Sequence, residues 1–269
     1  MLTFPFKKTN SLVNLLYYER GEEMELVIDN ITKKFGEKLI FDRASFQFEK
    51  GKIYGLLGRN GAGKTTLFNC ISQNVSLDDG RIYLNDKDEQ IQNYDNTDIG
   101  FVYTTPHLPA FMTAYEFVRF FVDINREKIK DIQRTEDYLL SVGIDKEDHH
   151  RLLKDFSHGM QNKVQMLVSL MVQPPVLLLD EPLTSFDVVA AHEMKEMIIH
   201  MKSASVIIFS THILQLAQDL CDEVVLLHHG KLRGIPANRI HDQDFEREVV
   251  QLLLSLIHIS EPTRQAEIS

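Results

Sequence analysis

A glycine-rich stretch at residues 58–65 restricts the fold of this chain more than any other sequence feature. It reads GRNGAGKT and matches the pattern G-x-x-x-x-G-K-[ST] in full. The apolar run at 53–57 before it predicts a buried parallel strand, and a helix is expected from about Lys64. Glycines allow backbone N–H groups to turn inward, and the N-terminus of the following helix attracts anions. The stretch therefore predicts a loop that wraps phosphate groups.

The residues of this loop have separate expected roles in holding ATP and Mg²⁺. Lys64 is expected to reach the β- and γ-phosphates, and the Thr65 hydroxyl to bind the metal ion. The backbone N–H of Thr66 is expected to face the α-phosphate. The residues that we expect the loop to contribute are Gly58, Asn60, Gly61, Gly63, Lys64, Thr65 and Thr66.

A second apolar run, VLLLDE at residues 176–181, ends in two acids. Such a strand would deliver Asp180 beside the metal ion, where a carboxylate suits hard Mg²⁺. Glu181 would then orient or deprotonate the attacking water. A strand that ends in Asp-Glu is otherwise often a solvated turn. The phosphate-binding loop upstream favours the catalytic interpretation.

Residues 156–161 read FSHGMQ and open a predicted helix before these acids. A small hydroxyl at Ser157, a glycine at Gly159 and a helix N-terminus together can bind an anion. An ordinary helix N-cap is the alternative interpretation of the same residues.

These elements, in this order, resemble the nucleotide-binding subunits of ABC transporters. The similarity covers about residues 26 to 236 and includes a downstream Ser-Thr-His run at 210–212. The resemblance implies a head-to-tail dimer in which each ATP lies between the loop of one subunit and the Ser-x-Gly-x-Gln element of the other. Ser157, Gly159 and Gln161 would then serve the γ-phosphate bound by the partner subunit.

The resemblance assigns further positions. His212 falls at the switch histidine that contacts the γ-phosphate and the water, and a structural histidine is the alternative. Asp187 falls in the loop that couples the two sites, and a helix N-cap is a compatible role. Phe35 falls at the aromatic residue that stacks on adenine, and a core phenylalanine is the alternative. Thr104 stands where the family usually has a glutamine that touches Mg²⁺ and relays to the membrane subunit. Because threonine is shorter, we expect a water-mediated contact with the metal ion or weaker coupling to the membrane subunit.

The predicted fold is α/β: a P-loop NTPase core with a parallel sheet, an antiparallel β subdomain and a helical signature subdomain. Short β-rich runs at 26–28 and 44–48, separated by turns such as 35–37, favour the antiparallel layer, with a turn at 78–80 before a further strand. Strands are expected at 99–103, 176–179, 206–209 and 224–227, and helices dominate from about 104 to 172, where Thr113 and Glu116 form a capping box. The ATPase domain is expected to span 24–236, followed by a partial C-terminal segment at 237–253.

Both ends of the chain differ from this domain. Residues 1–23 have no clear period and Met24 would serve as a start codon, so a non-native extension and a genuine one are both open. Residues 254–264 read LSLIHISEPTR, which matches the translation of a transposase adapter used in DNA sequencing. We expect 254–269 to derive from that adapter, with a natural amphipathic tail as the alternative.

Net charge and hydropathy limit the classes of partner that we expect for this chain. The net charge of −10 disfavours a nucleic-acid binder that relies on a diffuse basic field. No apolar run approaches the roughly 20 residues that span a bilayer. The lack of such a run predicts a cytoplasmic protein. The resemblance to ABC transporter subunits implies an ATPase subunit that an integral permease subunit holds at the inner face of the membrane and that pairs with a second nucleotide-binding subunit. The runs GMQNK and STHIL resemble bacterial exporter-type subunits. An importer subunit and a soluble ABC ATPase acting on ribosomes or chromosomes are the alternatives.

Overall fold

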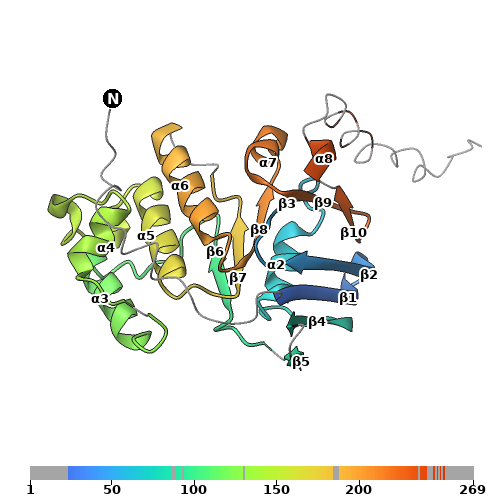
Figure 1. The fold of residues 1–269 in the computed structure, drawn as a ribbon, viewed down its shortest axis with the longest axis horizontal. Coiled ribbons are helices and arrows are strands. Elements are labelled where there is room, and N and C mark those ends of the chain that lie inside the picture. Colours follow the sequence, from blue (N-terminus) through green and yellow to red (C-terminus); the bar gives the residue numbers. More distant parts are fainter. Residues whose placement is uncertain are drawn as a thin grey trace, which may run out of the picture.

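The computed structural model describes residues 24–86, 89–92, 94–129, 131–183, 188–235 and 237–240, together with positions 245, 247, 249 and 251. Two sheets and a group of helices make up this part of the chain (Figure 1). The predicted α/β class, with a parallel sheet, an antiparallel layer and a helical subdomain, is confirmed.

The first sheet is antiparallel, as the short β-rich runs and turns between 24 and 48 predict. Its strand order is β2-β1-β4-β5. The strands are β1 (Met24–Phe35), β2 (Lys38–Glu49), β4 (Asp79–Asp86) and β5 (Glu89–Gln92). The turn expected at 78–80 is wrong in its last two positions, because β4 already begins at Asp79. Gly80 has a φ of 80° there, and a Cβ on it would lie 2.5 Å from the backbone oxygen of Asn30 on β1. The glycine thus permits close pairing of two strands.

The second sheet carries the phosphate-binding loop. Its strand order is β10-β9-β3-β8-β7-β6. The strands are β3 (Ile53–Leu57), β6 (Ile99–Val102), β7 (Val176–Asp180), β8 (Val206–Thr211), β9 (Glu223–His228) and β10 (Lys231–Ile235). All neighbouring pairs are parallel except β9 and β10, a short edge strand that the sequence pattern did not predict. Strands β3, β7 and β8 are buried at every position, which explains their continuous apolar runs.

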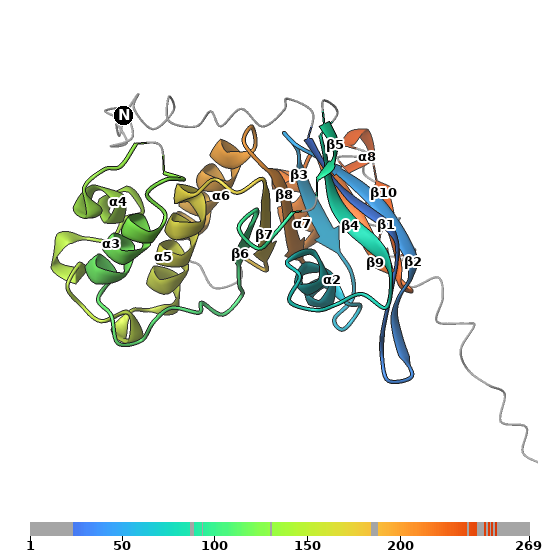
Figure 2. The ribbon, with the colours of Figure 1, turned by 90° about the horizontal axis from the view of Figure 1, so that it is seen from below.

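Helices cover the parallel sheet and form a separate lobe. The helices are α2 (Lys64–Ile71), α3 (Ala114–Ile124), α4 (Thr135–Ser141), α5 (His158–Met171), α6 (Val188–Met201), α7 (Leu214–Leu220) and α8 (Ala237–Ile240). Two 3₁₀ turns, η2 (Lys146–Asp148) and η3 (Leu153–Asp155), precede α5. Thr113 and Glu116 make the predicted capping box at the start of α3. The green lobe of Figures 1 and 2, with α3 and α4, lies at the opposite end of the molecule from the antiparallel sheet.

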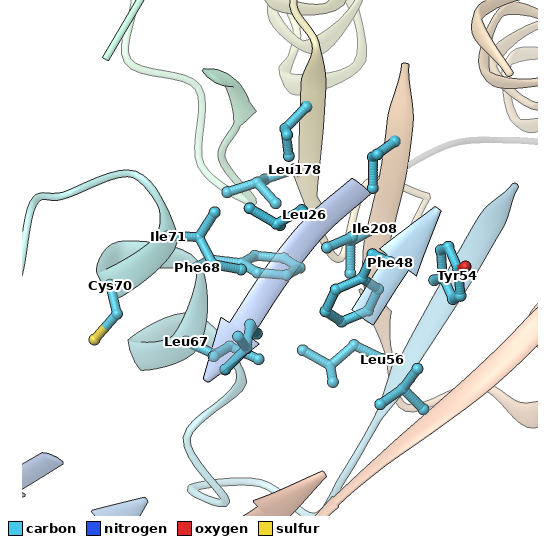
Figure 3. Close-up of a cluster of buried hydrophobic side chains, with 14 of the residues drawn as sticks. Leu26, Phe48, Tyr54, Leu56, Leu67, Phe68, Cys70, Ile71, Leu178 and Ile208 are labelled. Carbon is cyan, nitrogen blue, oxygen red and sulfur yellow. The ribbon is translucent and has the colours of Figure 1, made fainter. Parts of the chain in front are cut away.

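Helix α2 lies in the core between the two sheets. Its residues Leu67, Phe68 and Ile71 pack with Leu26 of β1 and with β7 and β8 (Figure 3). A different cluster on the other face of the parallel sheet joins Met166 of α5 with residues of α6 and α7. The alternation along β7 explains the division, because Leu178 belongs to the first cluster and Leu177 and Leu179 to the second. Helices α2 and α5 therefore cover opposite faces of the parallel sheet.

No helix in the described ranges is long and apolar enough to cross a bilayer.

Candidate nucleotide-binding site

The glycine loop connects β3 to α2, as its sequence predicts. Gly61 and Gly63 have φ angles of 78° and 108°, a left-handed region that favours glycine. Gly58 lies against the end of β9, where a Cβ would approach the Leu227 oxygen to 2.9 Å. The Lys64 side chain is 7% exposed, and its Nζ donates to the Gly58 oxygen at 2.9 Å. The lysine cation is thus held inside the loop, where a phosphate group would meet it.

The start of α2 faces the end of β7. The Thr65 hydroxyl donates to Oδ2 of Asp180 at 3.0 Å, although the two residues lie 115 positions apart. A hydroxyl and a carboxylate side by side are hard oxygen donors of the kind that Mg²⁺ takes. The two residues therefore fit the metal site that the sequence predicts, and phosphate oxygens would complete it. Mg²⁺ bound there would neutralise negative charge on the phosphates.

Ser210 on β8 fixes the other side of Asp180. Its hydroxyl donates to Oδ1 of Asp180 at 2.6 Å, and it accepts the Glu181 N–H at 3.0 Å. Ser210 opens the Ser-Thr-His run at 210–212, but the sequence pattern assigned no role to it. Its signal was present, because Ser210 is a polar residue at the end of an apolar strand, and the parallel register places it directly beside Asp180. Asp180 is thus fixed by one hydroxyl on each carboxylate oxygen.

Glu181 and His212 lie together after β7 and β8. Nδ1 of His212 is 3.2 Å from Oε1 of Glu181. The glutamate side chain is 23% exposed and the histidine side chain 52% exposed, so both groups reach the surface beside the loop. Glu181 has a φ of 50°, which is uncommon for a residue with a side chain. The two groups that the sequence assigns to the attacking water are therefore neighbours.

The Ser-x-Gly-x-Gln element opens α5. Ser157 caps the helix, accepting the Met160 N–H at 3.2 Å, so the N-cap interpretation is confirmed and leaves a binding role open. Ser157 is exposed. Gln161 differs from it, because its amide nitrogen donates to the carbonyls of Leu153 and Phe156 within the helical lobe. The described contacts of Gln161 thus lie within the helical lobe, whereas those of Lys64 lie within the loop, and no hydrogen bond among the described residues joins the two parts of the predicted site.

Three remaining predicted positions have different outcomes. Phe35 ends β1 and is 52% exposed, so the alternative of a core phenylalanine is wrong. Lys33 Nζ lies 5.2 Å from the centre of its ring. Thr104 lies beside Asp180, but its hydroxyl donates to the Asp180 backbone oxygen at 2.8 Å. Asp187 lies outside the described residues.

The arrangement can bind a nucleotide triphosphate and activate water beside it. A buried lysine and inward-turned loop hold phosphates, a hydroxyl and a carboxylate suit a divalent cation, and a second carboxylate reaches the surface next to an imidazole. Preorganised groups of this kind lower the barrier to phosphoryl transfer chiefly by positioning and by electrostatic stabilisation.

Comparisons with known proteins identify the family of this chain. Residues 41–184 match the ABC transporter family. An uncharacterized ABC transporter ATP-binding protein of Methanocaldococcus jannaschii is 32% identical over 78% of this chain and 79% of its own length. A sulfate/thiosulfate import ATP-binding protein of Mesostigma viride is 30% identical over 86% and 67%. A bacitracin transport ATP-binding protein of Enterococcus faecalis is 31% identical over 78% and 68%.

A solved structure supports the fold. It is a dimeric ATP-binding cassette in a post-hydrolysis state with ADP and Pi, and it matches with a TM-score of 0.66 at 20% identity, over 79% of this chain and 98% of that one. The chain belongs to the ABC transporter family and is one of its ATP-binding ATPase cassettes.

Proposed function

We propose that this protein is the ATP-hydrolysing subunit of a transporter, acting as a head-to-tail dimer that drives a separate integral membrane subunit, in the direction of export. ATP binding would close the dimer and push the membrane subunit, and hydrolysis would reopen it. In this proposal Lys64 and the loop hold the phosphates, Thr65 and Asp180 hold Mg²⁺, and Glu181 with His212 acts on the attacking water.

The dimer is supported by the division of the site within one chain. Ser157 is exposed at the start of α5, whose Gln161 bonds within the helical lobe, whereas Lys64 bonds to Gly58 within the phosphate-binding loop. A second copy turned head to tail would bring its Ser157 and Gly159 to the phosphates held by the first. The exposed Phe35 is available for adenine in the same arrangement.

One observation supports the contact with a membrane subunit. The segment that starts at Thr104, beside the nucleotide site, reaches an exposed aromatic residue. Thr104 is bonded to the backbone of Asp180, and seven positions later Phe111 is 81% exposed. Leu108 between them packs against the core of the helical lobe, which holds the segment in place. In this proposal the exposed Phe111, seven positions along the chain from Thr104, is the residue that an apolar loop of the membrane subunit contacts.

The direction of transport rests on the sequence runs at 159–163 and 210–214, which resemble exporter-type subunits. The relatives include a protein named for bacitracin transport and one named for sulfate/thiosulfate import, so both directions occur among them. Export remains our proposal for this chain, with the transporter partner keeping the subunit at the membrane.

The neighbouring gene is the first test of the proposal: we expect it to encode a six-helix membrane protein, and co-expression of that protein with this chain is the second test. We expect the wild-type chain to sediment with membranes that contain the partner, and Phe111→Asp to remain in the supernatant. Ile199→Asp is the matched control, because Ile199 is also an exposed apolar residue, 44% exposed on α6, and this variant should still sediment. Thermal unfolding of both variants shows whether either is damaged. A wild-type chain that stays in the supernatant with these membranes would contradict the proposal and favour a soluble ABC ATPase.

A further inference from the structure

The peptide group between Asp180 and Glu181 is held from both sides by hydroxyl groups. Its carbonyl accepts a hydrogen bond from Thr104 Oγ1 at 2.8 Å. Its N–H donates to Ser210 Oγ at 3.0 Å. A backbone carbonyl can only accept and an N–H can only donate, so the direction of both bonds follows from the chemistry. Thr104 follows β6 and Ser210 lies on β8, the strands on either side of β7.

Rotation of this peptide group would move Glu181. A peptide is planar, so it turns as a unit, changing ψ of Asp180 and φ of Glu181 together. The φ of Glu181 is 50°, and residues with a side chain rarely adopt this region unless their surroundings impose it. The two hydroxyls oppose the rotation that would return Glu181 to an ordinary conformation. In the held conformation the Glu181 carboxylate lies 3.2 Å from His212 Nδ1.

Thr104 is itself held on its other side. The carbonyl of Tyr103, in the peptide that joins it to Thr104, accepts a hydrogen bond from Gln165 Nε2 at 3.0 Å. Gln165 is 5% exposed and lies on α5, the helix that begins with Ser157. The Thr104 hydroxyl therefore has little freedom to leave the Asp180 carbonyl, and it stands in a chain of contacts that joins α5 to Glu181.

We propose that Thr104 is a positioning residue for ATP hydrolysis: its hydroxyl fixes the Asp180–Glu181 peptide and so keeps the Glu181 carboxylate beside His212. The proposal rests on the role given to Glu181 under the proposed function. In this role the Thr104 hydroxyl contacts the backbone carbonyl of Asp180 and does not contact the metal ion directly. The segment from Thr104 to Phe111 then influences the rate of hydrolysis through the orientation of Glu181.

Steady-state hydrolysis by the full chain, titrated separately with ATP and with Mg²⁺, tests this role. Thr104→Val removes the donor at nearly constant size, and we expect kcat to fall about tenfold with the KM for ATP and the Mg²⁺ requirement within about twofold of wild type. Thr104→Ser keeps the hydroxyl and should retain at least about half of the wild-type kcat. Thr97→Val, an exposed threonine just before β6, is the matched control and should leave all three quantities unchanged. If Thr104→Val does not fold, Thr104→Cys supplies a weak donor of similar size in its place.

Three outcomes would overturn the proposal. An unchanged kcat in Thr104→Val would show that the bond does not matter for the reaction. A raised Mg²⁺ requirement would assign the hydroxyl to the metal ion, and a Ser variant as slow as the Val variant would assign the loss to packing. Glu181→Gln separates this proposal from the one it rests on: if that variant hydrolyses ATP at the wild-type rate, the role of Glu181 fails, whereas its inactivity beside an active Thr104→Val refutes the positioning role alone.

Discussion

Nδ1 of His212 lies 3.2 Å from Oε1 of Glu181, although 31 positions separate the two residues along the chain. A carboxylate only accepts hydrogen bonds, so the imidazole donates through Nδ1 and leaves Nε2 for another partner. The pair joins the ends of two adjacent parallel strands, β7 and β8, at the edge of the sheet where the phosphate-binding loop begins.

Replacing this histidine should slow hydrolysis. His212→Ala removes the group that orients the Glu181 carboxylate, and we expect kcat to fall about a hundredfold, within the range of general acid–base contributions. Steady-state ATPase assays measure the effect, with His200→Ala, an exposed histidine at the end of α6, as the control. A kcat within about twofold of wild type would argue against any role for the pair in the reaction.

Loss of the Thr65 hydroxyl should weaken metal binding. In Thr65→Val, Asp180 Oδ2 keeps its place but loses the oxygen 3.0 Å away that would share the ion. We expect the Mg²⁺ concentration for half-maximal hydrolysis to rise at least about tenfold, a usual effect of changing groups around a metal site. Thr97→Val again serves as the control. An unchanged requirement would mean that the ion binds elsewhere.

Packing around β3 gives a prediction that is independent of catalysis. A Cβ added to Gly55 would lie 2.5 Å from the Sγ of Cys221 and 3.4 Å from the Cβ of Ala217. We expect Gly55→Ala to lower the free energy of unfolding by about 1–3 kcal/mol, the usual cost of overpacking. Urea unfolding checks this. In the Cys221→Ala background the substitution should cost much less, and an undiminished cost there would place the strain elsewhere.

The capping box of α3 gives a pH dependence. The pKa of the Glu116 carboxyl is lowered from its ordinary 4.5, first by the backbone N–H of Thr113 and then by the Thr113 side chain. Because the folded pKa is lowered, the ionised carboxylate stabilises the fold above pH 4.5, and this contribution is lost as the pH falls through the lowered value.

Glu116→Gln should therefore have a lower free energy of unfolding than wild type at neutral pH. The two proteins should become equally stable as the pH falls and the Glu116 carboxylate of wild type is protonated. Urea unfolding at pH 7 and at a series of pH values below 4.5 measures the difference. A difference between the two proteins that stays constant down to the lowest pH would show that the charge on Glu116 does not contribute.

The sequence predicted best where neighbouring residues determine the structure. The strand, loop and helix around Lys64 follow from a local pattern, and so does the cap at Thr113, because each depends on residues a few positions apart. The fully apolar run of β7 also predicted a strand covered on both faces, since alternation is lost only when both faces are buried.

The sequence predicted least where strand register or backbone strain decides the contact. Ser210 meets Asp180 only because β7 and β8 pair in one register, which no local pattern specifies. Glu181 has a positive φ, and the peptide group before it is bonded to Thr104, which follows β6, and to Ser210 on β8, two residues far away in sequence. The Gln161 amide donates to the carbonyls of Leu153 and Phe156, a contact that no local pattern indicates. The edge strands β5 (EQIQ) and β10 (KLRGI) contain polar residues and lack the continuous apolar run that identifies β3 and β7.

The molecular mass of Glu181→Gln in solution, with and without ATP, tests the central claim most directly. We expect a monomer without nucleotide and, with ATP, a stable dimer that retains the ATP without hydrolysing it. Ser157→Arg in the same background should prevent the dimer. A variant that stays monomeric with ATP bound, or that hydrolyses ATP at the wild-type rate, would contradict the head-to-tail dimer in which Glu181 acts on the attacking water.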